Sequence, residues 1–191
     1  ETTVTNPVLY GPAGSGAANE QAITLAQVDN IRQITINKYG WDPLGVASTT
    51  ESNQENTSLR VDYILNENHR LTYNYKSTEG DRLRASGSNS SFYFESASYF
   101  KGEKTDTSSI LLVSDWSDNL VSEIYYSNKS TDTSQESPAG QNVPNFYIDD
   151  AYGMRVYLGA DIYRSANELA TETDFLKAKL TYYTGNHKIT A

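Results

Sequence analysis

The sequence contains no cysteine among its 191 residues. This absence excludes a disulfide framework, a thiolate metal site and a cysteine nucleophile within the chain. Positive charge is also scarce, since 15 Lys and Arg residues stand against 24 Asp and Glu residues and leave a formal net charge of −9. Such an acidic balance argues against a nucleic-acid-binding surface, so we expect no nucleic-acid partner.

Long apolar runs are absent as well. No stretch reaches the ~18 consecutive apolar residues that a membrane-spanning helix needs. The strands of a membrane barrel give a much weaker signal per segment, so they are not excluded by this absence. The chain also shows no initiator methionine and no signal peptide at its start, and we expect it to be a piece of a longer protein.

Tyrosine is abundant, with 15 residues against 5 phenylalanines. Its ring packs against apolar neighbours while its hydroxyl stays hydrated, which suits a sheet that is in contact with water on one side only. Residues 58–79 alternate apolar and polar side chains on either side of a tight turn at 66–69. The apolar positions are Leu59, Val61, Tyr63, Leu65, Leu71, Tyr73 and Tyr75. A period of two gives one apolar face and one polar face and predicts a β-hairpin.

Two more tight turns, at 117–119 and 185–187, follow the same pattern. They predict a second hairpin over about 106–129 and a last strand over 175–182 that turns and continues at Lys188. The connections at 80–105 and 130–172 are far longer than these turns, an asymmetry typical of outer-membrane barrels. If all three tight turns lie on one side of the membrane, the alternating segment 155–163 cannot be a strand that crosses the membrane completely. We therefore predict a hairpin or strand extension within a loop there.

Residues 1–56 contain no convincing alternation, so no strand is expected in them. Thr24 can cap a short helix that carries Leu25, Val28 and Ile31. The predicted fold is all-β: an antiparallel segment of a large transmembrane β-barrel with long extracellular loops and a short loop helix. In this division, residues 1–56 form an extracellular loop region with the helix, and residues 57–191 form the barrel strands and their loops.

Two groups of side chains are candidate functional residues. The first is a set of aromatic residues expected in a loop, which could contact a ligand, form a membrane-interface girdle or pack against other loops: Phe92, Tyr93, Phe94, Tyr99 and Phe100. The second is a set of basic residues on the polar strand faces, where a wet lumen is expected: Arg60, Arg70, Lys76, Lys177 and Lys179.

Signatures of catalysis are missing. No nucleophile elbow and no phosphate-binding loop is present. His69 and His187 lie in tight turns without further ligands at metal-binding spacing. Asp149, Asp150 and Asp161 favour a solvated acidic loop over a calcium site. We expect no enzyme activity, no catalytic residue, no metal and no cofactor.

Several segments resemble the barrels of TonB-dependent outer-membrane receptors, in particular the Oar-like group. The sequence similarity lies in residues 59–75, 116–123 and 180–189. In addition, the helical segment 25–34 followed by residues 39–43 is similar to a loop of the same group. The resemblance covers most of the chain, and the similar motifs are those of strands and turns rather than catalytic signatures.

This resemblance implies a middle segment of a 22-stranded barrel that a separate N-terminal domain plugs. It also implies partners: the rest of the barrel and its plug, the TonB complex acting through that plug, outer-membrane lipid and a scarce nutrient as ligand. The location would be the bacterial outer membrane with loops exposed at the cell surface. No plug and no TonB-contacting box is recognised in this segment. The alternative is a secreted soluble β-sandwich, a carbohydrate-binding or adhesive module whose apolar face packs on a second sheet.

Overall fold

The computed structural model describes residues 2–47, 49–140, 142–164 and 167–191, and the described chain is mostly β. The strands are β1 (Thr2–Pro7), β2 (Tyr10–Ala13), β3 (Asn19–Thr24), β4 (Thr49–Asn66), β5 (His69–Arg84), β6 (Ser91–Tyr93), β7 (Tyr99–Ser117), β8 (Leu120–Glu136), β9 (Phe146–Ala151), β10 (Met154–Leu158), β11 (Asn167–Thr184) and β12 (His187–Thr190). The helical elements are α1 (Leu25–Ile34), the π-helical η1 (Thr35–Tyr39) and the 3₁₀ turn η2 (Glu95–Ala97).

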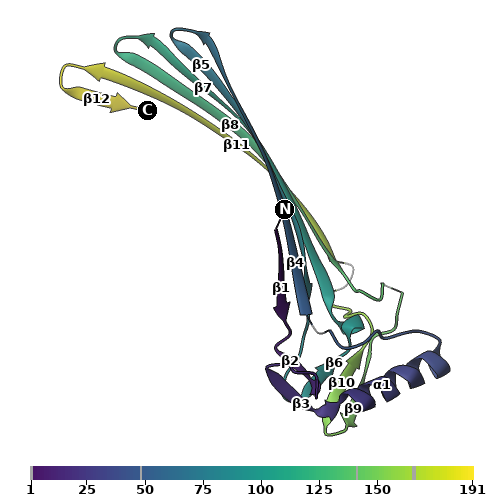
Figure 1. Cartoon of the computed structure of the whole chain (residues 1–191). Coiled ribbons are helices and arrows are strands. Elements are labelled where there is room, and N and C mark those ends of the chain that lie inside the picture. The colour runs from purple at the N-terminus through teal and green to yellow at the C-terminus, as the bar shows by residue number, and fades with distance from the viewer. Residues whose placement is uncertain (1, 48, 141, 165–166) are drawn as a thin grey trace. The chain divides into compact units, whose positions relative to one another are not determined.

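The largest sheet has seven strands in the order β1-β4-β5-β7-β8-β11-β12. The turns of its three hairpins lie at one end of the sheet (Figure 1). Backbone bonds join neighbouring turns, because Asp115 N donates to Asn68 O at 2.8 Å and Tyr183 N donates to Asn119 O at 2.8 Å. The predicted hairpins are therefore confirmed, with their tight turns together. Among the described residues the sheet does not close on itself, and β1 and β12 are its two edges.

The strands of these hairpins are longer than the sequence predicts. β4 has 18 residues, β5 16, β7 19, β8 17 and β11 18, whereas strands of globular proteins usually have about 3–10. β7 begins at Tyr99 rather than near residue 106, so the preceding connection covers residues 85–98 and is shorter than the predicted 80–105. The added parts are mostly polar, with Leu83, Tyr99, Phe100 and Leu169 among them, and show no regular alternation. Backbone pairing extends the strand there without a pattern in the side chains.

The expectation of no strand in residues 1–56 is wrong. β1 pairs antiparallel with the start of β4, from Thr2 opposite Gln54 to Pro7 opposite Thr49. β1 is exposed throughout, so no buried face marks it in the sequence. β2 and β3 form a separate parallel pair, and such a pair depends on packing by distant residues rather than on a local pattern.

The chain divides into two compact units. Unit 1 comprises residues 1–54, 80–103 and 133–169, and unit 2 comprises residues 55–79, 104–132 and 170–191. Unit 2 contains the hairpin turns of the large sheet, and unit 1 contains the helix and the small sheets.

The predicted helix is confirmed, including its first residue. Thr24 Oγ1 accepts from Gln27 N while Gln27 Oε1 accepts from Thr24 N, which is a reciprocal capping box. Val28 and Ile31 are buried on the inner side of α1. The helix axis ends after η1 at Gly40, whose φ of 76° is the left-handed conformation that favours glycine at this position.

Unit 1 has a hydrophobic core of its own. α1 supplies one side of it, and the sheet β6-β10-β9 supplies the other (Figure 1). Its buried members are Ile23, Val28, Ile31, Phe92, Phe94, Met154, Val156 and Leu158. β9 and β10 pair antiparallel outside the large sheet, so the prediction that the alternating segment near residue 155 is a hairpin and not a crossing is confirmed.

Candidate functional site

Side-chain contacts assign the two faces of the large sheet within unit 2. On one face, Thr72 Oγ1 of β5 donates to Asp62 Oδ1 of β4 at 2.6 Å. On the other face, Tyr75 of β5 bonds to Asp106 of β7, Trp116 of β7 to Ser122 of β8, and Tyr126 of β8 to Asp174 of β11. Successive residues of a strand point to opposite sides. These contacts therefore fix which side chains share a face across five strands.

The second of these surfaces, which carries Tyr75, Trp116 and Tyr126, is the apolar face, and it presents odd-numbered residues of β4 and β5 and even-numbered residues of β7, β8 and β11. Its apolar members are Leu59, Val61, Tyr63, Leu65, Leu71, Tyr73, Tyr75, Ile110, Leu112, Trp116, Leu120, Ile124, Tyr126, Leu176, Ala178, Leu180 and Tyr182. Many of them are open to the surroundings, for example Leu59 at 53% and Leu176 at 72%. No second sheet covers this face in the part of the chain that the structure describes.

The apolar face is bounded by aromatic side chains with polar partners. Tyr75 and Tyr126 lie at the margin away from the hairpin turns, and their hydroxyls donate to Asp106 and Asp174 at 2.8 and 2.7 Å. At the margin near the turns, Trp116 Nε1 donates to Ser122 Oγ at 2.8 Å, and the Trp116 ring lies against His69 with centroids 5.0 Å apart. Each ring thus lies on the apolar side with its polar atom turned to a polar partner.

The opposite surface, the polar face, carries all five basic residues that the sequence singled out: Arg60, Arg70, Lys76, Lys177 and Lys179. Arg60 pairs with Asp62 through two hydrogen bonds of 2.7 and 3.0 Å. Lys179 Nζ donates to Glu123 Oε1 at 2.8 Å. Arg60 and Arg70 thus both lie near Asp62, and Lys177 and Lys179 both lie near Glu123.

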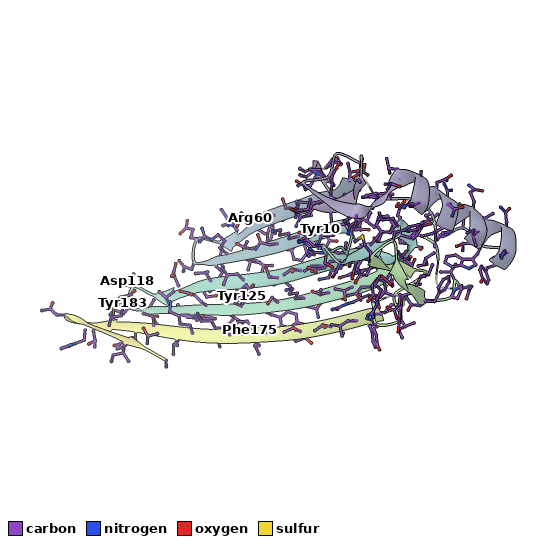
Figure 2. The ribbon with its side chains drawn as sticks, turned by 90° about the horizontal axis from the view of Figure 1, so that it is seen from below. Tyr10, Arg60, Asp118, Tyr125, Phe175 and Tyr183 are labelled. Atoms are coloured by element: carbon purple, nitrogen blue, oxygen red, sulfur yellow. The ribbon has the colours of Figure 1, made fainter. Side chains whose placement is uncertain are left out.

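A small apolar hollow interrupts the polar face. Tyr125 of β8 and Phe175 of β11 lie on neighbouring strands with ring centroids 6.1 Å apart (Figure 2). Leu111 lines the same hollow, together with Glu123 and Lys177. The polar face therefore presents both charged side chains and flat apolar rings.

The five aromatic candidates separate into three environments. Phe92 and Phe94 are buried in the core of unit 1, 5.2 Å apart in an edge-to-face pair, which favours the packing interpretation for these two. Tyr93 lies on the other side of β6. Tyr99 and Phe100 are the first residues of β7 and not loop residues, because that strand begins earlier than expected.

Tyr93 belongs to an aromatic row on the outer side of the sheet β6-β10-β9, and sequence reasoning missed its other members, Tyr157 and Tyr147. Tyr93 stacks on Tyr157 with ring centroids 4.4 Å apart, and Tyr147 lies 5.8 Å from Tyr157. Arg155 covers the Tyr147 ring at 4.7 Å and pairs with Asp149 at 2.6 Å. Partial burial raises the pKa of the Tyr93 hydroxyl. In the sequence, the signal for this row was the alternation in β10, which places Arg155 and Tyr157 on the same face of the strand.

The acidic and histidine residues form no metal site among the described residues. Asp149 is bound by Arg155, and Asp161 Oδ1 accepts from Tyr163 N at 2.8 Å. His69 and His187 begin the strands that follow two of the tight turns. Asp149 and Asp150 lie within β9, so the interpretation as acidic loop residues is wrong for them and holds for Asp161.

No helix among the described residues is long and apolar enough to cross a membrane. A scan against family models, a search of curated proteins and a search of solved structures each returned no match for this chain.

Proposed function

We propose that this chain is a wall segment of a TonB-dependent outer-membrane transporter of the Oar-like group, with no catalytic chemistry of its own. The observation that carries the proposal is the uncovered apolar face of the large sheet, opposite a face with paired charges. A transmembrane barrel requires this arrangement, because its outer surface meets lipid and its inner surface meets water.

The strand dimensions support the same proposal. A barrel strand needs about 9–11 residues to cross the bilayer at a tilt, and the hairpin strands have 16–19. The surplus leaves polar strand ends beyond the apolar face. Aromatic margins whose polar atoms, the tyrosine hydroxyls and the Trp116 indole N–H, are turned to polar partners are typical of the two membrane interfaces.

The open edges of the sheet also fit a larger barrel. β1 and β12 each present one unpaired side, and unpaired backbone groups are costly in lipid. The partners of these edges would be neighbouring strands of the same protein, and the transported nutrient would pass on the polar side. The unit 1 segments would then be part of the extracellular surface.

The proposal is tested by the location and size of the protein that carries this chain. An antibody raised against the chain is used on fractionated source cells, and the detected band is sized on a gel. A band in the outer-membrane fraction, several-fold above the chain's 21.2 kDa, supports the transporter. A secreted or soluble band near 21.2 kDa contradicts it and favours the β-sandwich module, which would need a second layer over the apolar face.

A further inference from the structure

Charge is divided unequally between the two faces of the large sheet in unit 2. The polar face presents even-numbered residues of β4 and β5 and odd-numbered residues of β7, β8 and β11, and Lys188 of β12 joins it by pairing with Tyr183. Besides the five basic residues named above, it carries Lys129 and Lys188. Its acidic residues are Asp62, Asp115 and Glu123. Among the strand residues that the structure describes in unit 2, this face is therefore net positive, although the chain has a net charge of −9.

Most acidic residues of the same strands lie on the apolar face, at and beyond the margin that Tyr75 and Tyr126 form. They are Glu55, Glu79, Asp106, Asp132, Glu172 and Asp174. In the described strands of unit 2, Lys104 is the one Lys or Arg residue on this side. A surface with an excess of one sign of charge raises the local concentration of oppositely charged solutes. The polar face therefore favours anions over cations.

The apolar hollow of the polar face lies within this positive surface. Its volume is about 350 Å³, inside the ~300–1,000 Å³ that small-molecule sites occupy. Tyr125 and Phe175 lie on neighbouring strands with ring centroids 6.1 Å apart, and Phe175 is 51% exposed (Figure 2). Leu111 completes the apolar part of the lining. Exposed aromatic surface of this kind fits a flat apolar group, which would pack on it and displace water.

A lysine without an ion-pair partner borders the hollow. Glu123, the acidic residue of the lining, is bound by Lys179 at 2.8 Å. Lys177 also lines the hollow and forms no ion pair with the residues that the structure describes. Lys188 lies close enough to Glu123 for the two charges to interact. An anion at the rim would therefore meet Lys177 without displacing an existing ion pair.

We propose that this hollow binds an anionic solute that carries a flat apolar ring, with the ring against Tyr125 and Phe175 and the acidic group near Lys177. The transported nutrient would then belong to this chemical class rather than to neutral or cationic solutes. This assignment rests on the proposed function, because only a closed barrel makes the polar face the wall of a passage.

The open form of the hollow suits a passage. Its walls belong to one sheet, so a solute is held from one side and keeps much of its hydration on the other. Small-molecule sites of high affinity instead bury 70–90% of their ligand's surface. Weak binding is required along a passage, because the solute must be able to leave the site as well as enter it.

The test uses the whole protein in outer membranes isolated from source cells. Ser127→Cys places a thiol on the polar face of β8, two residues from Tyr125, and leaves the lining of the hollow unchanged. Its alkylation by neutral iodoacetamide is followed by mass spectrometry in the presence of benzoate, acetate, benzyl alcohol or benzylammonium, at equal concentration and ionic strength. Ser130→Cys is the matched control, since position 130 lies on the opposite face of β8.

We expect benzoate to slow alkylation at position 127 by about threefold or more, and the other three compounds to slow it clearly less, because each lacks the ring or the negative charge. None should protect position 130. Lys177→Gln is expected to remove the protection by benzoate. Lys38→Gln makes the same charge change at an exposed position of unit 1 and is expected to leave the protection intact.

Three results would overturn the inference in a protein that is present in the outer membrane. One is equal protection by benzoate and benzylammonium, and another is protection by benzoate that Lys177→Gln does not change. The third is no alkylation at position 127 without any added compound, which would mean that polypeptide covers the face. Absence of the protein from the outer-membrane fraction would instead contradict the transporter proposal, on which the inference rests.

Discussion

At the scale of single residues, Gly159 shows how a backbone position can be restricted to glycine. Its φ is 82°, and a Cβ at this position would overlap the carbonyl oxygen of Pro144. Its N–H also donates to the buried Ser96 Oγ at 3.0 Å, which ties the end of β10 to the turn after β6. The residue therefore combines a left-handed conformation with a close backbone contact.

We predict that Gly159→Ala destabilises unit 1 by more than the ~1 kcal/mol of a left-handed alanine. Gly140→Ala is the matched control, because Gly140 has a φ of 80° and nothing within 4 Å of its added Cβ. Thermal or urea unfolding of the two variants measures the difference. An equal loss of stability in both would show that the contact with Pro144 contributes nothing.

The ion pair between Arg32 and Asp42 joins the end of α1 to the loop that follows it. Arg32 donates to both carboxylate oxygens at 2.8 and 2.6 Å, and Leu44 N donates to Oδ1 at 2.8 Å. The hydrogen bonds from Arg32 and from the Leu44 N–H hold the pKa of Asp42 below its usual value. The ionised form of Asp42 therefore stabilises the folded state.

This stabilisation should be fully present above the ordinary aspartate pKa of ~3.9 and lost as the pH falls through the lower folded-state value. Both side chains are more than a third exposed, so solvent screening limits the contribution to about 1 kcal/mol or less. We predict that Asp42→Asn lowers the unfolding midpoint near about pH 7 and that this difference shrinks as the pH falls below the ordinary aspartate value of ~3.9. Unfolding of both proteins across this range is the measurement, and a difference that does not shrink toward the acidic end would contradict the prediction.

At the scale of elements, the sequence predicts what a local pattern encodes. The hairpin turns and α1 follow from alternation and from the Thr24 capping residue, and the structure contains them. β1 and the first residues of β4 and β7 could not be predicted, because they are held by backbone pairing and their side chains show no period of two. The aromatic row of Tyr93, Tyr157 and Tyr147 was also hidden, since its strands come from segments that only the tertiary fold brings together.

Neighbouring leucines in β7 allow a direct comparison of the two sheet faces. Leu111 lines the hollow of the polar face with Glu123, and Leu112 shares the apolar face with Trp116. If the apolar face meets lipid, Leu112→Arg costs about 2–4 kcal/mol near the bilayer midplane, whereas Leu111→Arg faces water and can pair with Glu123. We predict a large loss of outer-membrane protein and of urea resistance for the Leu112 variant only. Equal effects of the two substitutions would contradict a lipid-facing surface.

At the scale of the whole molecule, the chain combines two units with different physical requirements. Unit 1 has a buried core, and such a core can be stable in water. Unit 2 is a sheet layer with an open apolar surface, which requires an apolar neighbour. The sequence indicated the two-faced sheet through its alternation. The medium that covers the apolar face is not encoded in this pattern, because it consists of molecules outside the chain, and the transporter proposal assigns lipid to it.

The absence of cysteine makes that proposal directly measurable. Single substitutions Leu111→Cys and Leu112→Cys each introduce the only thiol in this chain, which is labelled with a small fluorophore in the membrane-inserted protein. Quenching is then compared between lipids that carry a quencher in their acyl chains and aqueous iodide. We predict that the probe at position 112 is quenched by the lipid and the probe at 111 by iodide. Quenching of both probes by iodide alone would contradict the account, because both faces of the sheet would then meet water.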